Sequence, residues 1–150
     1  MDIYRRLKAD HDTQRDLFEQ IASTEGESHQ RKVLWSKLKV ELEAHAAAEE
    51  QTFYAELMTH PDATEQSRHS VAEHQEASDL IAEIDDIDMS SSAWLQKCKH
   101  LKDRVLHHVE EEEDEVFPKA KTMISKSRSE ELANEFNDRK PAEKKERSAA

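Results

Sequence analysis

The chain has 150 residues, enough for one compact domain, and 37% of them are charged against 35% hydrophobic, so the sequence predicts a slim core beneath a charged surface. A net charge of −12 argues against nucleic acid as a partner, because the surface would repel phosphate backbones. The single cysteine, Cys98, excludes an internal disulfide, and no run of roughly 20 apolar residues is present for a membrane span.

The composition favours helices over strands. There are only one glycine and three prolines, while Ala, Leu, Glu, Lys and Gln are common. Three short polar segments, STEGES, THPD and DMSSS, interrupt stretches whose apolar residues recur with a period near 3.6. In the last segment, Ser91 or Ser92 is suited to cap the helix that follows. The four predicted helices span residues 2–23, 29–59, 63–87 and 92–124.

Short loops between long helices predict an all-α fold, an up-down-up-down four-helix bundle. Pro118 removes a backbone donor and should kink the fourth helix or end its regular part. Residues 129–138 could form a short fifth helix, and we expect the polar tail after Pro141 to be flexible. The domain organisation expected is therefore a bundle over residues 1–126, followed by a short helix and tail over residues 127–150.

Each predicted helix carries one histidine on its inward stripe, and two helices add a glutamate one turn later. These six residues are His11, His45, Glu49, His74, His108 and Glu112. Each histidine lies 13 to 17 residues from the loops beside it, so histidines on neighbouring helices differ by two to four residues, or about 3–6 Å at the rise of an α-helix. The four imidazoles should therefore lie in one layer of the bundle.

Six polar groups in a slim core indicate a metal site, because buried polar groups and carboxylates without partners are costly. Four nitrogens and two carboxylates are too many for one tetrahedral zinc. They suit two ions, each held by two histidines and both bridged by the two glutamates, with a bridging oxide or hydroxide and an open position. Two iron ions fit this donor set best, with zinc or manganese as substitutes.

Several neighbouring residues have less specific roles. Phe53 and Phe117 should form a wall of the site, and Gln14 is a candidate to hydrogen-bond a ligand imidazole. Cys98 should pack as a small core residue. The remaining histidines are predicted to lie at the surface or in loops; they are His29, His60, His69, His100 and His107.

Four segments resemble the helices of hemerythrin-like proteins of the HHE cation-binding type: DHDTQRDLFEQI, LEAHAAAEEQTFYAEL, VAEHQEASDLI and VLHHVEEEEDEVFPKA. The resemblance covers about residues 2–124 and includes the phenylalanine after each His-plus-Glu pair and the proline after the second. It implies a four-helix bundle with a non-haem di-iron centre, and it places the same six residues in the ligand positions.

The resemblance departs from the oxygen-carrying hemerythrins at one point. Those proteins have a fifth histidine one turn from the third-helix ligand, where this chain has Ser70 and Ser78. The six-ligand set looks more like bacterial proteins that repair iron–sulfur centres, although those carry an additional N-terminal cysteine-containing module. Other HHE proteins decompose peroxide or sense iron or oxygen.

Four functions remain open from the sequence. They are a module that binds or senses O2 or NO, a peroxidase-like or NO-reducing enzyme, an iron storage, delivery or repair protein, and a metal-free interaction bundle. The expected partner is a small diatomic ligand or peroxide. We expect a cytoplasmic protein, because the N-terminal stretch lacks the apolar core of a signal peptide, and a monomer or weak homodimer without membrane contacts.

Overall fold

Long helices dominate the computed structural model, which describes residues 1–148, and these residues contain no strand. Three of the helices are interrupted or extended by short π or 3₁₀ turns. In chain order the elements are α1 (Ile3–Ala22), α2 (His29–Glu49), the π turn η1 (Glu50–Tyr54), α3 (Ala55–Leu57), the 3₁₀ turn η2 (Pro61–Ala63), α4 (Thr64–Asp85), α5 (Ser92–Glu111), the π turn η3 (Glu112–Val116), α6 (Phe117–Lys121) and α7 (Lys126–Ser148).

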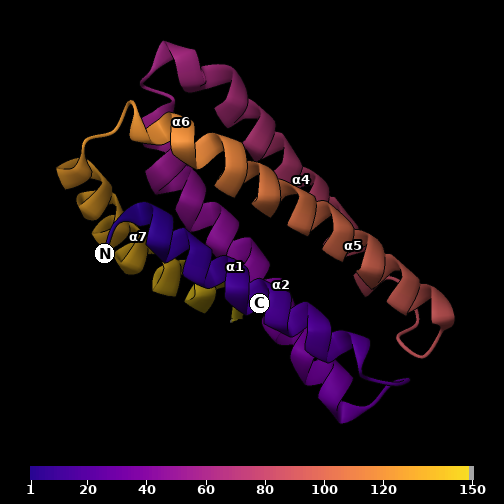
Figure 1. Cartoon of the computed structure of the whole chain (residues 1–150). Coiled ribbons are helices and arrows are strands. Elements are labelled where there is room, and N and C mark those ends of the chain that lie inside the picture. The colour runs from indigo at the N-terminus through magenta and orange to yellow at the C-terminus, as the bar shows by residue number, and fades with distance from the viewer. Residues whose placement is uncertain (149–150) are drawn as a thin grey trace.

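The helices form the predicted four-helix bundle. α1 packs on α2, α4 packs on α5, and α1 also contacts α5 while α2 contacts α4. Figure 1 shows α4 and α5 running side by side, with α1 and α2 beside them and α7 lying across the outer side of this second pair. None of the described helices combines the length and apolarity needed to cross a bilayer.

The helix boundaries follow local signals in the sequence. Asp2 and Ser28 cap α1 and α2, since their side chains accept hydrogen bonds from backbone N–H groups three residues later. The chain turns between these helices at Gly26, whose φ of 54° is unfavourable for other residues. Ser91 occupies the cap position of α5 as predicted, but its hydroxyl makes no capping hydrogen bond.

Two π turns interrupt the bundle at equivalent heights, directly after α2 and after α5. The second turn ends just before Pro118, whose ring nitrogen cannot donate to a backbone carbonyl, so the predicted break in the fourth helix is confirmed. The first turn has no proline and was not predicted. A π turn accommodates one extra residue, and at the end of each turn two adjacent side chains are buried: Phe53 with Tyr54, and Val116 with Phe117.

The apolar core is divided into two clusters. One cluster, at the end of the bundle near the N-terminus, contains Tyr4, Phe53 and Phe117, and the other, toward the Gly26 turn, contains Trp35 and Trp94. The buried histidines and glutamates of the four bundle helices belong to neither cluster. The fold therefore has a polar layer between two apolar ends.

The C-terminal helix is longer than the sequence predicted. The expected helix over residues 129–138 is present, and Leu132 and Phe136 are buried against the bundle as expected. However, α7 continues through Pro141 to Ser148, so the prediction of a flexible tail is wrong for residues 141–148. The last two residues of the predicted tail, 149 and 150, lie outside the described residues.

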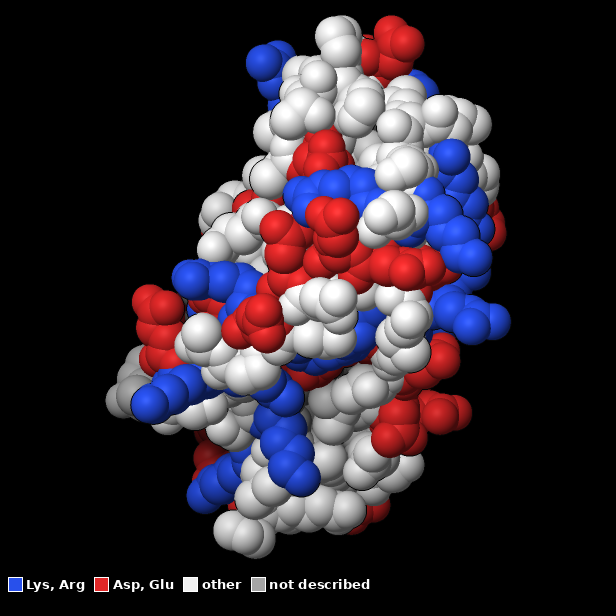
Figure 2. Space-filling view, turned by 90° about the vertical axis from the view of Figure 1, so that its left-hand side faces the viewer, with Lys and Arg blue, Asp and Glu red and all other residues white. Residues whose placement is uncertain are grey.

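Buried ion pairs explain why this polar segment stays helical. Lys140 donates to Asp10 at 2.8 Å and to Glu41 at 2.7 Å, and all three side chains are buried. Glu143, also buried, accepts from Gln51 at 2.8 Å. Figure 2 shows acidic and basic side chains interspersed over the corresponding side of the molecule. These pairs dock the second half of the helix, whereas Leu132 and Phe136 dock the first half through apolar contacts.

Candidate metal centre

The six predicted residues meet in the polar layer of the bundle. His11 comes from α1, His45 and Glu49 from α2, His74 from α4, His108 from α5, and Glu112 from the start of the second π turn. Both carboxylates are fully buried. His11, His45 and His108 are also buried, and 11% of the His74 side chain is exposed. The imidazoles lie in two pairs: the ring centres of His11 and His45 are 5.5 Å apart, and those of His74 and His108 are 4.8 Å apart.

Each glutamate lies between one histidine of each pair. Glu112 places Oε1 3.1 Å from Nε2 of His11 and Oε2 3.3 Å from Nε2 of His108. Glu49 places Oε2 3.5 Å from Nε2 of His45 and Oε1 3.2 Å from Nε2 of His74. The four Nε2 atoms and both carboxylates therefore converge on one space. They form two overlapping groups of ligand atoms, one containing His11 and His45, the other His74 and His108.

Several of these converging atoms have no hydrogen-bond partner among the described residues. They are Nε2 of His11 and His108, both carboxylate oxygens of Glu49, and Oε1 of Glu112. A buried polar atom without a partner is destabilising, and a buried carboxylate especially so. Cations between the two histidine pairs would satisfy all of them. The donor set of imidazole and carboxylate suits metal ions.

The outward-facing nitrogen of every imidazole is hydrogen-bonded to a carboxylate from the adjacent helix. The four Nδ1–carboxylate pairs are His45 with Asp10 (2.6 Å), His74 with Glu50 (2.7 Å), His108 with Glu73 (2.8 Å) and His11 with Glu113 (2.6 Å). They link α1 to α2, η1 to α4, α4 to α5 and η3 back to α1, which closes a ring. A carboxylate accepts the Nδ1 proton, so each Nε2 lone pair points into the centre, as in metal-bound histidines.

The sequence did not identify these four carboxylates. Each is the chain neighbour of a residue in the centre, and the helical phase turned it about 100° away from the stripe, toward solvent. In the folded bundle, however, each of these carboxylates meets the Nδ1 atom of an imidazole on the adjacent helix. Gln14, which was predicted to bond a ligand imidazole, is buried in the cavity wall, and the carboxylates take that role instead.

The carboxylates give the centre a strong preference for positive charge. Burial alone would lower the pKa of His45, but the carboxylates of Glu49 and Asp10 raise it to about 10. Burial likewise opposes protonation of His108, while Glu112 and Glu73 raise its pKa well above the usual value. In turn, burial raises the pKa of Glu112, and the histidines around it hold that pKa well below its usual range. Without a cation, protons must balance these charges.

Tyr54 is a further residue of the site that the sequence did not identify. Its hydroxyl donates to Oε2 of Glu112 at 2.5 Å, and its ring centre lies 6.1 Å from that of His74. Burial, together with the charge of Glu112, raises the pKa of the phenol well above its usual value, so the phenol stays protonated and remains a donor. The first π turn brings Tyr54 inward beside Phe53, and no proline or glycine marks this turn in the sequence.

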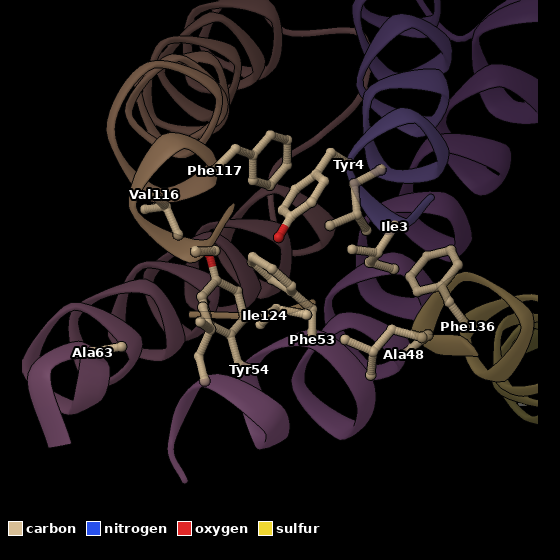
Figure 3. Packing of buried hydrophobic residues seen from close by; sticks show 14 residues of the cluster. Ile3, Tyr4, Ala48, Phe53, Tyr54, Ala63, Val116, Phe117, Ile124 and Phe136 are labelled. Carbon is tan, nitrogen blue, oxygen red and sulfur yellow. The ribbon is translucent and has the colours of Figure 1, made fainter. Parts of the chain in front are cut away.

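Aromatic rings close one side of the centre, as predicted for Phe53 and Phe117. Figure 3 shows these two rings gathered with that of Tyr4, and the centres of the Tyr4 and Phe117 rings are 5.3 Å apart. Phe117 also lies nearly parallel to the imidazole of His11, with ring centres 6.3 Å apart. All three aromatic side chains are buried. This wall excludes water from that side of the polar layer.

A cavity of about 280 Å³ reaches the centre from the other side. All four histidines contribute to its lining, together with apolar residues such as Leu42, Ile81 and Val105 from the second core cluster. Charged side chains, among them Arg104 and Arg147, line it as well. The cavity therefore has room for a molecule of a few atoms next to the histidines.

The two serines of the third bundle helix occupy different surroundings. Ser78 lines the cavity, whereas Ser70 is buried and its hydroxyl has no partner among the described residues. Cys98 is buried as predicted, and burial raises the pKa of its thiol to about 12, which disfavours the reactive thiolate. His69 and His107 are exposed, as predicted.

Comparisons with known proteins agree with this geometry. A family model described as the hemerythrin HHE cation binding domain matches residues 2–120. The crystal structure of a hemerythrin HHE cation binding domain-containing protein from Mycobacterium kansasii has a similar fold. It shares 23% sequence identity and a TM-score of 0.86, and the match covers 97% of this chain and 89% of that one. No curated protein sequence matches the chain. The family description and the buried cluster together indicate metal-ion binding.

Proposed function

The chain belongs to the family of hemerythrin HHE cation-binding domains, and from this premise we propose that its buried cluster holds two iron ions and binds or reacts with O2, NO or peroxide. The supporting observation is the placement of Glu49 and Glu112. Each carboxylate directs one oxygen toward each pair of histidines. A bridging carboxylate has this arrangement, whereas a single ion would need only one histidine pair.

The proposed ligand assignment follows the two groups of converging atoms. One ion would be held by His11 and His45 and the other by His74 and His108. Glu49 and Glu112 would serve both. With two imidazoles and two carboxylate oxygens apiece, each ion has four protein ligands, and a position remains for a small molecule. Zinc and manganese are substitutes that this donor set would also accept.

Iron would supply electron exchange with a small oxidant or gas, and the protein residues would control how that molecule arrives. The cavity admits molecules of a few atoms along a lining that combines apolar and charged side chains. The aromatic wall formed by Tyr4, Phe53 and Phe117 keeps water from the opposite side. The carboxylate ring fixes each imidazole in the tautomer that can bind a metal. Ser78, in place of a fifth histidine, leaves the cavity side of the centre less crowded.

The functional alternatives differ in what happens after the small molecule binds. Asp10, Glu50, Glu73 and Glu113 are all engaged with imidazoles, so their role is to orient the ligand histidines. Iron storage, delivery or repair of iron–sulfur centres remains the alternative, and it would be marked by transfer of iron to an acceptor protein.

The proposal is tested by reconstituting the protein with Fe2+ under anaerobic conditions and removing unbound metal. The iron content and the visible spectrum are then recorded on adding O2, NO or H2O2. We expect close to two irons per chain and a spectral change with each reactive molecule, both lost in His74→Ala and retained in the exposed-residue control His29→Ala. Steady consumption of NO or H2O2 would identify an enzyme. Fewer than one iron per chain in the wild type would contradict the proposal.

A further inference from the structure

A second cluster of metal-binding side chains lies outside the centre, on the seam between α4 and α5. It consists of His69 and Glu73 from α4 and of His107 and Glu111 from α5, and we call it the outer cluster. In both helices the glutamate follows the histidine by four residues, the spacing that also joins His45 to Glu49 in the buried centre. The two helices run side by side in Figure 1.

The ligand atoms of His69, Glu73 and Glu111 all lie within 4.8 Å of one another, as do those of each group in the buried centre. Nε2 of His69 lies 3.2 Å from Oε1 of Glu111 and 3.5 Å from Oε1 of Glu73. Nε2 of His107 lies 3.5 Å from Oε2 of Glu111. Glu111 therefore directs one oxygen to each histidine, as Glu49 and Glu112 do. Ligands about 2.1 Å from a metal are about 3.0–3.4 Å from one another, close to these values.

Neighbouring groups leave most of these atoms available. Arg104 pairs with Glu76 at 3.0 Å. It comes no closer than 3.9 Å to Glu73, and the oxygen it approaches is Oε2, not the Oε1 that lies next to His69. Gln66 donates a hydrogen bond to Glu111 at 3.3 Å, a weak contact that a metal ion would displace. Two carboxylates face two exposed imidazoles, so the cluster attracts a cation.

Glu73 connects the outer cluster to the buried centre. Its Oε1 accepts the hydrogen bond from Nδ1 of His108 and also faces His69, and its side chain is only 5% exposed. The histidines of the outer cluster are mostly exposed, with 52% of the His69 side chain and 59% of the His107 side chain accessible. An ion bound here would exchange readily with solvent while sharing one carboxylate with a ligand of the buried centre.

We propose that His69, Glu73 and Glu111 form a second, exchangeable binding site for a divalent transition-metal ion, with His107 beside the other oxygen of Glu111. Imidazole and carboxylate ligands suit Zn2+, Co2+ and Fe2+. The site lies outside the buried centre and is linked to it through Glu73, whose Oε1 also accepts the hydrogen bond from His108. Its exposure predicts weaker binding than at the buried centre.

The test is a calorimetric titration of the metal-free full-length chain with Co2+, comparing the wild type with His69→Gln/His107→Gln. We expect the double variant to bind one Co2+ fewer per chain, the weakest one, with its tighter binding unchanged. The matched control is His100→Gln, an exposed histidine of α5 outside the cluster, which should bind like the wild type. Both substituted histidines are exposed, so the variant should fold normally.

The result is a difference between two proteins and does not depend on the number of ions in the buried centre. If the buried centre binds no metal, the wild type should still bind one Co2+ that the double variant does not. Equal stoichiometry and affinity in the wild type and the double variant would overturn the outer site, even if the buried centre proves to hold two ions.

Discussion

The ammonium group of Lys140 lies 2.8 Å from the carboxylate of Asp10, inside the protein. The other oxygen of the same carboxylate accepts the Nδ1 proton of His45 at 2.6 Å. One buried aspartate thus joins the C-terminal helix to a histidine of the proposed metal centre. The last helix consequently supports the centre as well as covering the bundle.

Replacing Lys140 should destabilise the protein. Lys140→Met leaves Glu41 without its buried partner and removes one of the donors to Asp10, which keeps Arg6 and His45, and breaking a buried ion pair costs about 3–5 kcal/mol. Urea unfolding of the metal-free protein would measure the loss. The control is Lys144→Met, because Lys144 also pairs with Glu41 but is 48% exposed and should contribute no more than about 1 kcal/mol. Equal effects of the two substitutions would argue against a buried pair.

Removing the charge of Asp10 should weaken metal binding without removing a ligand. Asp10→Asn keeps the side-chain size but no longer fixes His45 through a charged acceptor, and such changes typically reduce metal affinity about 10–100-fold. Competition with a chelator of known affinity would measure it. Asp12→Asn on the same helix is the control, since its side chain is 79% exposed and lies outside the carboxylate ring. An unchanged affinity in Asp10→Asn would show that the ring does not support the centre.

The two tyrosines near the centre should respond differently to loss of their hydroxyl groups. Tyr54→Phe removes the donor to Glu112 and should cost about 1–3 kcal/mol in unfolding free energy. Tyr4→Phe is the matched control, because the Tyr4 hydroxyl is buried but finds no partner among the described residues, so its removal should be neutral or stabilising. Thermal unfolding of both metal-free variants would compare them. A larger loss for Tyr4→Phe would contradict the assigned contacts.

Metal binding should strengthen as the pH rises from about 6.5 toward 10. In the metal-free protein the pKa of His45 is raised to about 10, and the pKa values of His11, His74 and His108 are also raised. A metal must displace these protons, and it does so more easily at high pH. Apparent affinities for Zn2+ measured across this range would test the trend. Affinity independent of pH would mean that the histidines are not ligands.

The stability of the metal-free protein should change in the opposite direction. A histidine whose pKa is raised on folding stabilises the folded state below its unfolded pKa of about 6.5, and this contribution disappears as the pH rises through the folded value. Carboxylates with lowered pKa values, Asp10 and Glu112 among them, stabilise above about pH 4 and lose their effect as the pH falls through the folded value. The thermal midpoint should therefore be highest between about pH 4 and 6.5 and decrease toward pH 10.

The helical period was sufficient to predict the bundle and the residues that meet in its centre. The six positions stood out because polar side chains at inward positions are costly, so each histidine and glutamate on a stripe required a partner. The helical period could not predict contacts between helices. It predicted that Glu50 and Glu113 face solvent, whereas they hydrogen-bond to His74 and His11 on other helices.

Two other features of the structure could not be predicted from apolar periodicity. α7 docks largely through Lys140 and other charged groups, so its sequence resembles a solvated tail. The first π turn, Glu50–Tyr54, contains no proline or glycine that would signal a change of helical pitch. Tyr54 was therefore missed as a residue of the site. Both features arise from tertiary contacts with the rest of the bundle.

The most direct test of the proposed di-iron centre is anomalous diffraction at the iron absorption edge from crystals of the reconstituted protein. The account predicts two strong peaks in the polar layer, one beside His11 and His45 and the other beside His74 and His108, with Glu49 and Glu112 between them. A single peak in that layer, or none, would contradict it.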